Sequence, residues 1–180
     1  MIDEVSLTSW QSQYQKWVDF AKPLISMGKG KDAFAKYPWF STQGEPFTKL
    51  KKPASETHFG LVTTGGYSVS GEQEPMRAYP TFADEIPQIR PISMGVDRSK
   101  LKINHPGYDH KYAEQDINAN LPFDRLQELV DDGIIGSIAD ETLVLMGLQP
   151  NVEPLIKHTI PQIVDNFNSN GVEAALLVPS

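Results

Sequence analysis

The 180-residue chain contains no cysteine. Without thiols it forms no disulfide, no thiolate metal site and no cysteine nucleophile, so any thiol chemistry must come from elsewhere. Long apolar runs are also missing, since none approaches the roughly 20 residues that cross a bilayer. The first residues, MIDE, have neither the basic start nor the apolar centre of a signal peptide. We therefore expect a cytoplasmic protein without a membrane partner.

Basic residues are outnumbered, because 16 lysines and arginines face 23 aspartates and glutamates, which gives a net charge of −7 and a pI near 5.0. An acidic surface disfavours nucleic acid and anionic membranes as partners. The length and the 39% apolar content suffice for one sizeable core but not for two ordinary domains. We therefore predict one structural domain, whose two parts, residues 1–56 and 57–180, differ in pattern.

The first part is predicted to be a helix and an extended arm that pack on the core. Large or apolar residues recur at helical spacing: Trp10, Tyr14, Trp17, Val18 and Ala21. Thr8 and Ser9 are possible caps, and Pro23 limits or kinks the helix. The stripe packs on the chain's own core, the commoner arrangement, or docks onto another subunit. The irregular, proline-rich arm is expected to be ordered, because it carries Phe34, Tyr37, Trp39, Phe40 and Phe47.

Residues 57–180 predict an α/β domain with a parallel-type sheet flanked by helices. Strands are expected at 57–63, 101–104, 134–139 and 172–178. Helices are expected over 122–133 and over 152–170, where Pro154 and Pro161 divide the second one. This alternation is typical of parallel sheets. The last strand, VEAALLV, is apolar without alternation, as in a strand covered on both faces. We expect another polypeptide or self-association to cover its open face.

Candidate site residues follow the first expected strand. In α/β sheets, the loops after the carboxyl ends of the strands gather at one edge, where ligands bind. The turn there contains Thr63, Thr64, Gly65 and Gly66. It is either a plain turn or a backbone whose N–H groups approach a carboxylate or phosphate. It is not the dinucleotide fingerprint, which needs a third glycine opening a helix.

A second polar cluster follows the strand expected at 101–104. His105, Tyr108 and Asp109 offer groups for acid–base chemistry or form a solvated turn, and Asp116 is a further substrate-positioning candidate. No compact metal-ligand spacing is present, so we expect no metal. The long stretch 68–91, which contains four prolines, is typical of a lid or a partner-binding loop.

Several segments, in this order, carry a family resemblance: LVTTGG (61–66), GEQEPM (71–76), NHPGYD (104–109), DIN (116–118) with LPFDRL (121–126), GIIGS (133–137), MGL (146–148) and ALLVPS (175–180). Together, over residues 38–180, they resemble the selenoprotein B subunits of the glycine, sarcosine, betaine and D-proline reductases. The resemblance implies a component of an enzyme in which a selenolate or thiolate attacks a small amino-acid or betaine-like substrate and a carbon–nitrogen bond breaks. It also implies other reductase-complex subunits as partners.

The chain departs from this pattern at one point. Family members continue after the equivalent of VPS with selenocysteine or cysteine and then a helix, whose positive end favours an anionic chalcogen. The resemblance therefore implies a nucleophile after Ser180, and we interpret the sequence as the portion before a selenocysteine, either ended by a UGA codon read as stop or followed by a separate fragment. This chain alone is then inactive, because no hydroxyl in it shows the adjacent base that would replace a selenolate.

Two other interpretations stay open. The chain is a non-catalytic binding or structural subunit that completes its site with a cysteine- or selenocysteine-bearing partner. Alternatively it is a racemase-like α/β enzyme, which is disfavoured because cofactor-independent racemases typically use paired cysteines and this chain has none.

Overall fold

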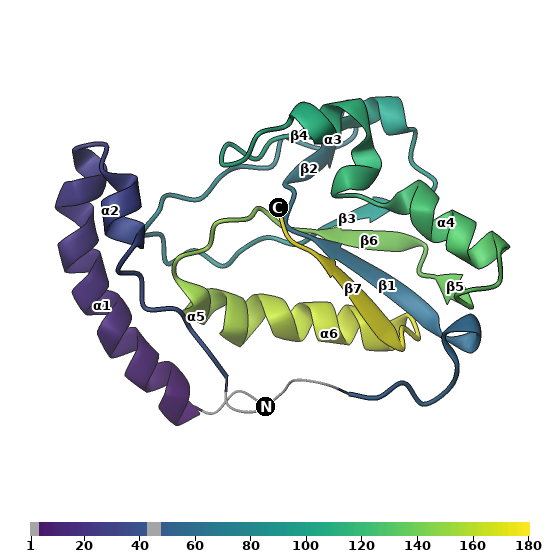
Figure 1. Cartoon of the computed structure of the whole chain (residues 1–180), viewed down its shortest axis with the longest axis horizontal. Helices are drawn as coiled ribbons and strands as arrows, with labels where there is room; N and C mark the ends of the chain where they lie inside the picture. Colours follow the sequence, from purple (N-terminus) through teal and green to yellow (C-terminus); the bar gives the residue numbers. More distant parts are fainter. Residues whose placement is uncertain (1–3, 43–47) are drawn as a thin grey trace.

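A mixed sheet forms the centre of the protein (Figure 1). The structure, a computed structural model, describes residues 4–42 and 48–180, so the expectation for Phe47 lies outside the described residues. Its five-stranded sheet consists of β1 (His58–Thr63), β3 (Arg90–Ser93), β5 (Ser137–Ile138), β6 (Glu141–Val144) and β7 (Ala174–Val178). β1 pairs in parallel with β7, β5 and β6, and β3 runs antiparallel to β6. The predicted α/β class with a parallel-type sheet is confirmed.

The strand expected at 101–104 lies outside this sheet. β4 (Leu101–Ile103) instead pairs antiparallel with β2 (Tyr67–Val69) in a separate two-stranded ribbon. Parallel neighbours need a long crossover, usually a helix, and residues 70–89 contain no helix or strand. The chain turns away directly after β1, where Gly66 takes a φ of +66°. The prediction of a parallel core strand at 101–104 was therefore wrong.

The region after residue 133 differs in detail from the expectation. Only Ser137–Ile138 of the segment 134–139 forms a strand, and β6 follows at once without having been predicted. β6 contains Thr142, a polar residue in a short run that gives little periodic signal. Its side chain is fully buried, and its hydroxyl donates to the Leu61 carbonyl at 2.9 Å.

Helices cover the two faces of the sheet. α4 (Phe123–Asp131) places Phe123 against one face, and α6 (Ile160–Ser169) places Phe167 against the other. The helix predicted over 152–170 is not broken into two pieces. α5 (Val152–Pro154) continues through a π-helical turn (Leu155–Thr159) into α6, because the wider turn accommodates the proline spacing without a break. The remaining short elements are α3 (Lys111–Gln115) and the 3₁₀ turns Ala54–Glu56, Arg98–Lys100 and Ile117–Ala119.

The N-terminal helix lies apart from the sheet (Figure 1). α1 (Glu4–Ser26) begins before Thr8 and Ser9, so these residues are not its caps, and it contains Pro23. With α2 (Gly30–Phe34), the arm and part of the 152–159 helix, it builds a separate core, here called the N-terminal aromatic cluster. The members of this cluster with aromatic rings are Trp10, Tyr14, Trp17, Phe34, Tyr37, Phe40 and Phe82. The stripe therefore packs within its own chain, although not on the sheet.

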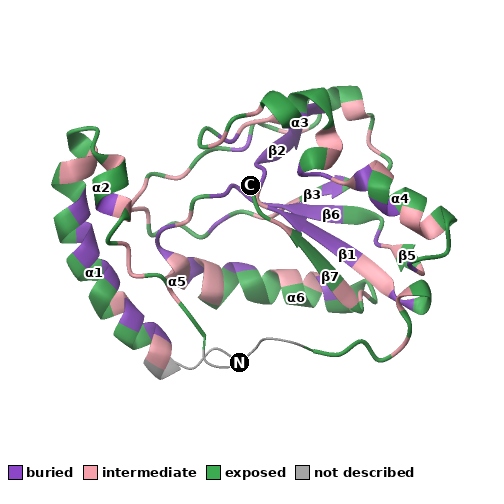
Figure 2. Cartoon of the chain, in the orientation of Figure 1, coloured by how far each residue is buried: buried purple, intermediate pink, exposed green. Residues whose placement is uncertain are grey.

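The last strand is uncovered. Figure 2 shows β7 largely exposed beside the buried β1. Leu176 is 38% exposed and Leu177 is 68% exposed. These two side chains belong to opposite faces, because they pair with Leu61 and Val62 of β1, which lie in the two different cores of the sheet. Within the described chain the strand is thus covered fully on neither face, and the expectation of an open apolar face is met.

Among the described helices, none has the length and apolar character needed to span a membrane.

Candidate functional site

Polar side chains meet where β1 and β7 end. We call this group the strand-end cluster; its members are Thr63, Thr64, Gly65, Gly66, Tyr67, His105, Tyr108, Asn120 and Ser180. Two segments distant in sequence are joined here, since the Ser180 N–H donates to Thr64 Oγ1 at 3.0 Å. The loop after β4 reaches the same edge because the Asn104 N–H donates to the Gly66 carbonyl at 2.9 Å. The expected convergence therefore occurs, although β4 belongs to the ribbon.

The N–H groups of the double-glycine turn are already bonded. Thr64 N–H donates to Val178 O at 3.2 Å, and Gly66 N–H donates to Leu145 O at 2.9 Å. Gly65 N–H donates to Thr63 Oγ1 at 3.1 Å. The turn therefore offers no free backbone donor at these positions in this arrangement. Of the two interpretations of the turn, its observed geometry matches the structural one.

Close packing requires the glycines of this turn. A Cβ on Gly65 would lie 2.6 Å from the Tyr67 ring, closer than real Cβ contacts. A Cβ on Gly66 would lie 3.0 Å from His105 Cβ, and the backbone there has a positive φ that L-residues rarely adopt. The glycines thus bring the Tyr67 and His105 side chains against the end of β1.

Asn120 is the centre of the hydrogen-bond network. It is only 7% exposed. Its Oδ1 accepts from the Tyr67 hydroxyl, and its Nδ2 donates to the Tyr108 hydroxyl at 3.0 Å and to Ser180 Oγ at 3.2 Å. The Tyr108 hydroxyl in turn donates to the Gly65 carbonyl at 3.2 Å. One carboxamide therefore links β2, the 105–110 loop and the end of β7.

Both phenols of the network stay protonated at neutral pH. Burial, with the nearby Tyr108, raises the pKa of Tyr67 far above its ordinary value. Burial also raises the pKa of Tyr108, against the lowering effect of its hydrogen bonds with Asn120 and Tyr67. These side chains are hydrogen-bond donors rather than bases, and both protons are already donated, by Tyr67 to Asn120 Oδ1 and by Tyr108 to the Gly65 carbonyl.

His105 is a buried, neutral imidazole. It is 4% exposed, and its Nδ1 accepts the Gly107 N–H at 2.9 Å, which assigns the ring proton to Nε2. In the described part of the chain that Nε2 has no hydrogen-bond partner, and it faces Gly147, where a Cβ would lie 2.6 Å away. Burial, and then the neighbouring His110, lower the pKa of His105. The carbonyl of His105 is held by His110 Nε2 at 2.6 Å.

The two predicted carboxylates lie on the surface. Asp109 Oδ1 accepts from the Lys111 N–H at 3.0 Å at the start of α3. Asp116 Oδ1 accepts from the Asn118 N–H at 2.9 Å, and its bonds with Asn118 lower its pKa. Both therefore cap local turns and share no hydrogen bond with the strand-end cluster. No group of three or more His, Asp or Glu side chains in residues 4–42 and 48–180 is arranged to hold a metal ion.

The structure brings together six of the predicted residues: Thr63, Thr64, Gly65, Gly66, His105 and Tyr108. It adds Asn120, which the sequence had not singled out for the site, and Tyr67, which ends the turn expected at this edge but was not among the site candidates. The only signal for Asn120 was its position directly before the LPFDRL segment. Neither residue type suggests a buried hub on its own, because asparagine before a helix is ordinarily a solvated turn residue.

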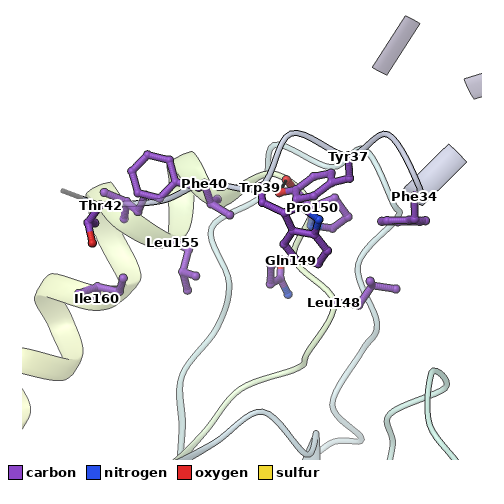
Figure 3. A pocket seen from close by; sticks show the side chains of 12 residues that line it. Phe34, Tyr37, Trp39, Phe40, Thr42, Leu148, Gln149, Pro150, Leu155 and Ile160 are labelled. Carbon is purple, nitrogen blue, oxygen red and sulfur yellow. Dashed lines mark hydrogen bonds between the residues drawn. The ribbon is translucent and has the colours of Figure 1, made fainter. Parts of the chain in front are cut away.

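An apolar groove, separate from the strand-end cluster, lies between the arm and the segment 148–160 (Figure 3). Its volume is about 440 Å³. Trp39, which is 80% exposed, and Leu148, which is 58% exposed, lie on its wall. Tyr37 is the one ionisable residue among its lining side chains, and its hydroxyl donates to the Pro150 carbonyl. The groove therefore lacks groups for acid–base chemistry.

The chain matches the model of the glycine/sarcosine/betaine reductase selenoprotein B family over residues 34–180. It belongs to this family. The match contains every member of the strand-end cluster and leaves α1 outside.

Curated relatives support the same assignment. The chain is 24% identical over 131 residues to the D-proline reductase subunit gamma of Acetoanaerobium sticklandii, covering 73% of this chain and 52% of the relative. It is 27% identical over 155 residues to the glycine reductase complex component B subunit gamma of Carboxydothermus hydrogenoformans, covering 86% of this chain and 35% of the relative. The matched region thus spans about half or less of these relatives. No solved structure matches the chain significantly.

Proposed function

We propose that this chain forms part of a reductase B subunit that cleaves the carbon–nitrogen bond of a glycine, sarcosine, betaine or D-proline type substrate. One observation carries the proposal: the family match over 34–180 contains a network of polar side chains at the carboxyl ends of β1 and β7. That edge is where α/β sheets bind ligands. The subunit role follows from the family, while the substrate and the reaction are the proposed part.

The reactive group is proposed to come from outside the present residues. A selenolate or thiolate at the end of β7, in a longer protein or on a partner chain, would supply the nucleophile that bonds to the substrate carbon while the amine departs. The chain's own residues would orient the end of β7 and donate hydrogen bonds. Thr64 fixes the end of β7 through the Ser180 N–H, and Asn120 holds Ser180 Oγ at 3.2 Å.

Hydrogen-bond donation to the substrate is a further proposed role of the strand-end cluster. Tyr108 is a protonated donor within hydrogen-bond reach of the Gly65 carbonyl at 3.2 Å, so a substrate oxygen close to that carbonyl could compete for its proton. The neutral His105 places no positive charge at this edge, so stabilisation of an anionic group there would come from hydrogen-bond donors. A cytoplasmic location is part of the proposal, since thiols and selenols stay reduced there.

Other subunits of a reductase complex are the proposed partners, and β7 is the proposed contact. Its outer edge carries no strand in the described chain, and Leu176 and Leu177 expose apolar surface on both faces. An exposed apolar edge strand is a template for pairing with another polypeptide.

A second candidate is a non-catalytic binding subunit whose partner bears the cysteine or selenocysteine. The lack of any cysteine, together with the two-sided exposure of β7, favours it.

The test is an activity measurement on the complex isolated from its own cells through a tag on this chain. With a dithiol as reductant, each of glycine, sarcosine, betaine and D-proline is supplied separately, and release of the amine, or of 5-aminovalerate-type ring-opened product for proline, is measured. We expect cleavage of at least one substrate by the complex and none by the chain alone. A complex that carries the chalcogen yet cleaves none of them would contradict the reductase proposal, and activity of the chain alone would contradict the external nucleophile.

A further inference from the structure

A polar cavity lies beside the strand-end cluster, between the β2–β4 ribbon and the loop that follows β2. Its volume is about 480 Å³, and its lining residues come from two segments: Ser68 to Pro75, and Lys102 with Asn104. The loop is the GEQEPM stretch of the sequence. The cavity is separate from the apolar groove of Figure 3, with which it shares no lining residue.

The floor of this cavity is fixed by Asn104. Its Oδ1 accepts from the Ser68 hydroxyl at 2.7 Å and from the Met76 N–H at 3.0 Å. Because a backbone N–H can only donate, the atom that faces it must be the carboxamide oxygen, and the orientation of the amide is settled. The two N–H donors of Asn104 then remain without a partner in the described part of the chain. Ser68 is 3% exposed, so this support is rigid.

The loop wall is fixed as well. Gln73 Oε1 accepts the Val69 N–H at 3.1 Å, and Gln73 Nε2 donates to the Pro91 carbonyl at 3.1 Å. Glu72 is paired with Lys100 at 2.7 Å across the ribbon. The charge of Glu72 is therefore compensated, and the loop is tied both to the turn before β4 and to β3 before any ligand binds.

Two charges on the cavity are left uncompensated. Lys102 lies opposite Ser68 in the ribbon register, so both side chains leave the same face, and Lys102 has no ion pair among the described residues. Its neighbour Lys100 is paired. The Glu74 carboxylate likewise has no hydrogen bond or ion pair in the described chain. The cavity thus presents one free ammonium, one free carboxylate and a fixed carboxamide donor.

We propose that this cavity binds a small zwitterion of the amino-acid class. Its carboxylate contacts the Lys102 ammonium and the Asn104 amide, and its positively charged nitrogen lies towards Glu74. Charge-assisted hydrogen bonds of this kind favour a ligand with both charges over a ligand with one. Asn104 connects the cavity to the site, because its backbone N–H donates to the Gly66 carbonyl at 2.9 Å. The inference rests on the proposed function in naming where its amino-acid substrate is held.

The experiment is an NMR titration of the full chain with glycine, and with acetate and methylammonium as singly charged probes. We expect saturable amide shifts in residues 68–75 and 102–104, with glycine binding at least fivefold more tightly than either probe. Betaine and D-proline are then titrated in the same way. Acetate binding as tightly as glycine, or saturable shifts elsewhere only, would overturn the proposal, as would no saturation at all.

Matched variants separate the two charged contacts. Lys102→Gln is expected to weaken glycine and acetate binding at least fivefold, whereas Glu74→Gln weakens glycine binding only. Lys16→Gln, on an exposed position of α1, removes the same charge far from the cavity and should leave binding unchanged. Equal effects of Lys102→Gln and Lys16→Gln would overturn the assignment. If the cavity fails this test while the isolated complex still cleaves a substrate, only the binding site is wrong.

Discussion

The N-terminal aromatic cluster and the strand-end cluster each have a buried centre, yet they are built in opposite ways. The first joins rings, with Trp10 and Tyr14 stacked at 4.9 Å and Trp17 at 5.0 Å from Tyr37. The second joins hydroxyls and amides around Asn120. α1, which carries most of the first, lies outside the family match, and the second lies wholly within it.

The comparison separates residues that stabilise the fold from residues that fix the geometry of the candidate site. Ring packing is non-directional and needs only apolar area, so it can hold an appended helix without fixing any atom precisely. A buried polar network fixes geometry where its members are bonded, as Asn120 and the two phenols are, whereas His105 Nε2 has no partner in the described chain. We therefore expect substitutions in the aromatic cluster to change stability, and substitutions in the strand-end cluster to change both stability and the position of β7.

The largest effect is expected from Trp17→Ala. Trp17 is 4% exposed, contacts four rings and donates from Nε1 to the Ala33 carbonyl at 2.8 Å. Truncating a buried tryptophan costs about 3–5 kcal/mol of unfolding free energy. Urea denaturation measures the loss, with Trp39→Ala at an 80% exposed ring as control, expected within about 0.5 kcal/mol. Shifts of the Asn120 and Tyr108 resonances in Trp17→Ala would show that the two clusters are not independent.

Asn120→Ala is expected to come next. It leaves the Tyr67 and Tyr108 hydroxyls short of a buried partner, which costs about 2–3 kcal/mol. It also removes one of the two hydrogen bonds that hold Ser180, so the Ser180 amide should become more mobile in NMR relaxation. Asn168→Ala, at an exposed position of α6, is the matched control and should change neither quantity. An ordered chain end in Asn120→Ala would contradict the role of the hub.

Buried tyrosines of the aromatic cluster should make stability depend on pH on the alkaline side, in the same direction as Tyr67 and Tyr108 of the strand-end cluster. Burial, with smaller contributions from Tyr37 and Asp84, raises the pKa of Tyr14 to about 12, and burial raises that of Tyr37 to about 12, from 10.0. The unfolded chain then loses these protons first, so the stability they contribute is complete below pH 10 and falls as pH rises towards 12. Urea midpoints against pH, with absorbance at 295 nm, test this. Tyr112→Phe, at a 67% exposed ring, should leave the fall unchanged, whereas Tyr37→Phe should reduce it.

His105 should make the folding stability depend on pH on the acid side. Its folded-state pKa lies below 6.5, so below pH 6.5 the unfolded chain binds a proton that the folded chain does not. Stability from this group is complete above pH 6.5 and falls as pH falls towards the folded-state pKa. The imidazole resonances of His105 report its midpoint directly. A midpoint at or above 6.5 would contradict the buried, neutral assignment.

The smallest effect on folding is expected from Leu177→Asp. At 68% exposure the side chain stabilises the isolated chain little, so the unfolding free energy should change by within about 0.5 kcal/mol. Assembly with the proposed reductase partners should nevertheless be lost. Leu148→Asp, at 58% exposure on the apolar groove, is the matched control and should assemble normally. Equal loss in both variants would remove β7 as the specific contact.

Periodicity predicted the parts of the fold that pack locally. The strand at 57–63, the helix ending before Gly133 and the aromatic stripe of α1 each carry their signal within about ten residues. The partner of the 101–104 strand depends on the chain reversal at Gly66. β6 was not predicted because it contains the polar Thr142, whose hydroxyl donates to the carbonyl of Leu61, far away in sequence. Neither fact is visible in a local window.

The site residues likewise fall into predicted and unpredicted groups. The double-glycine turn and the 105–110 loop were predicted because each follows a strand, and ligands bind at the carboxyl ends of strands in α/β sheets. Asn120 was not predicted as a site residue, because its role depends on three hydrogen bonds to partners 12 to 60 residues away in sequence. Asp109 and Asp116 were expected at the site from their chemistry, yet each serves a neighbouring N–H two residues on.

The strand-end cluster is proposed to work with a chalcogen nucleophile that the present residues do not contain. Intact mass and selenium analysis of the native protein, isolated with whatever binds it stoichiometrically, test this proposal. We expect either a selenium-containing polypeptide heavier than 20.1 kDa or a 20.1 kDa chain in a stoichiometric complex with a cysteine- or selenocysteine-bearing chain. A lone 20.1 kDa protein with no selenium and no such partner would contradict it.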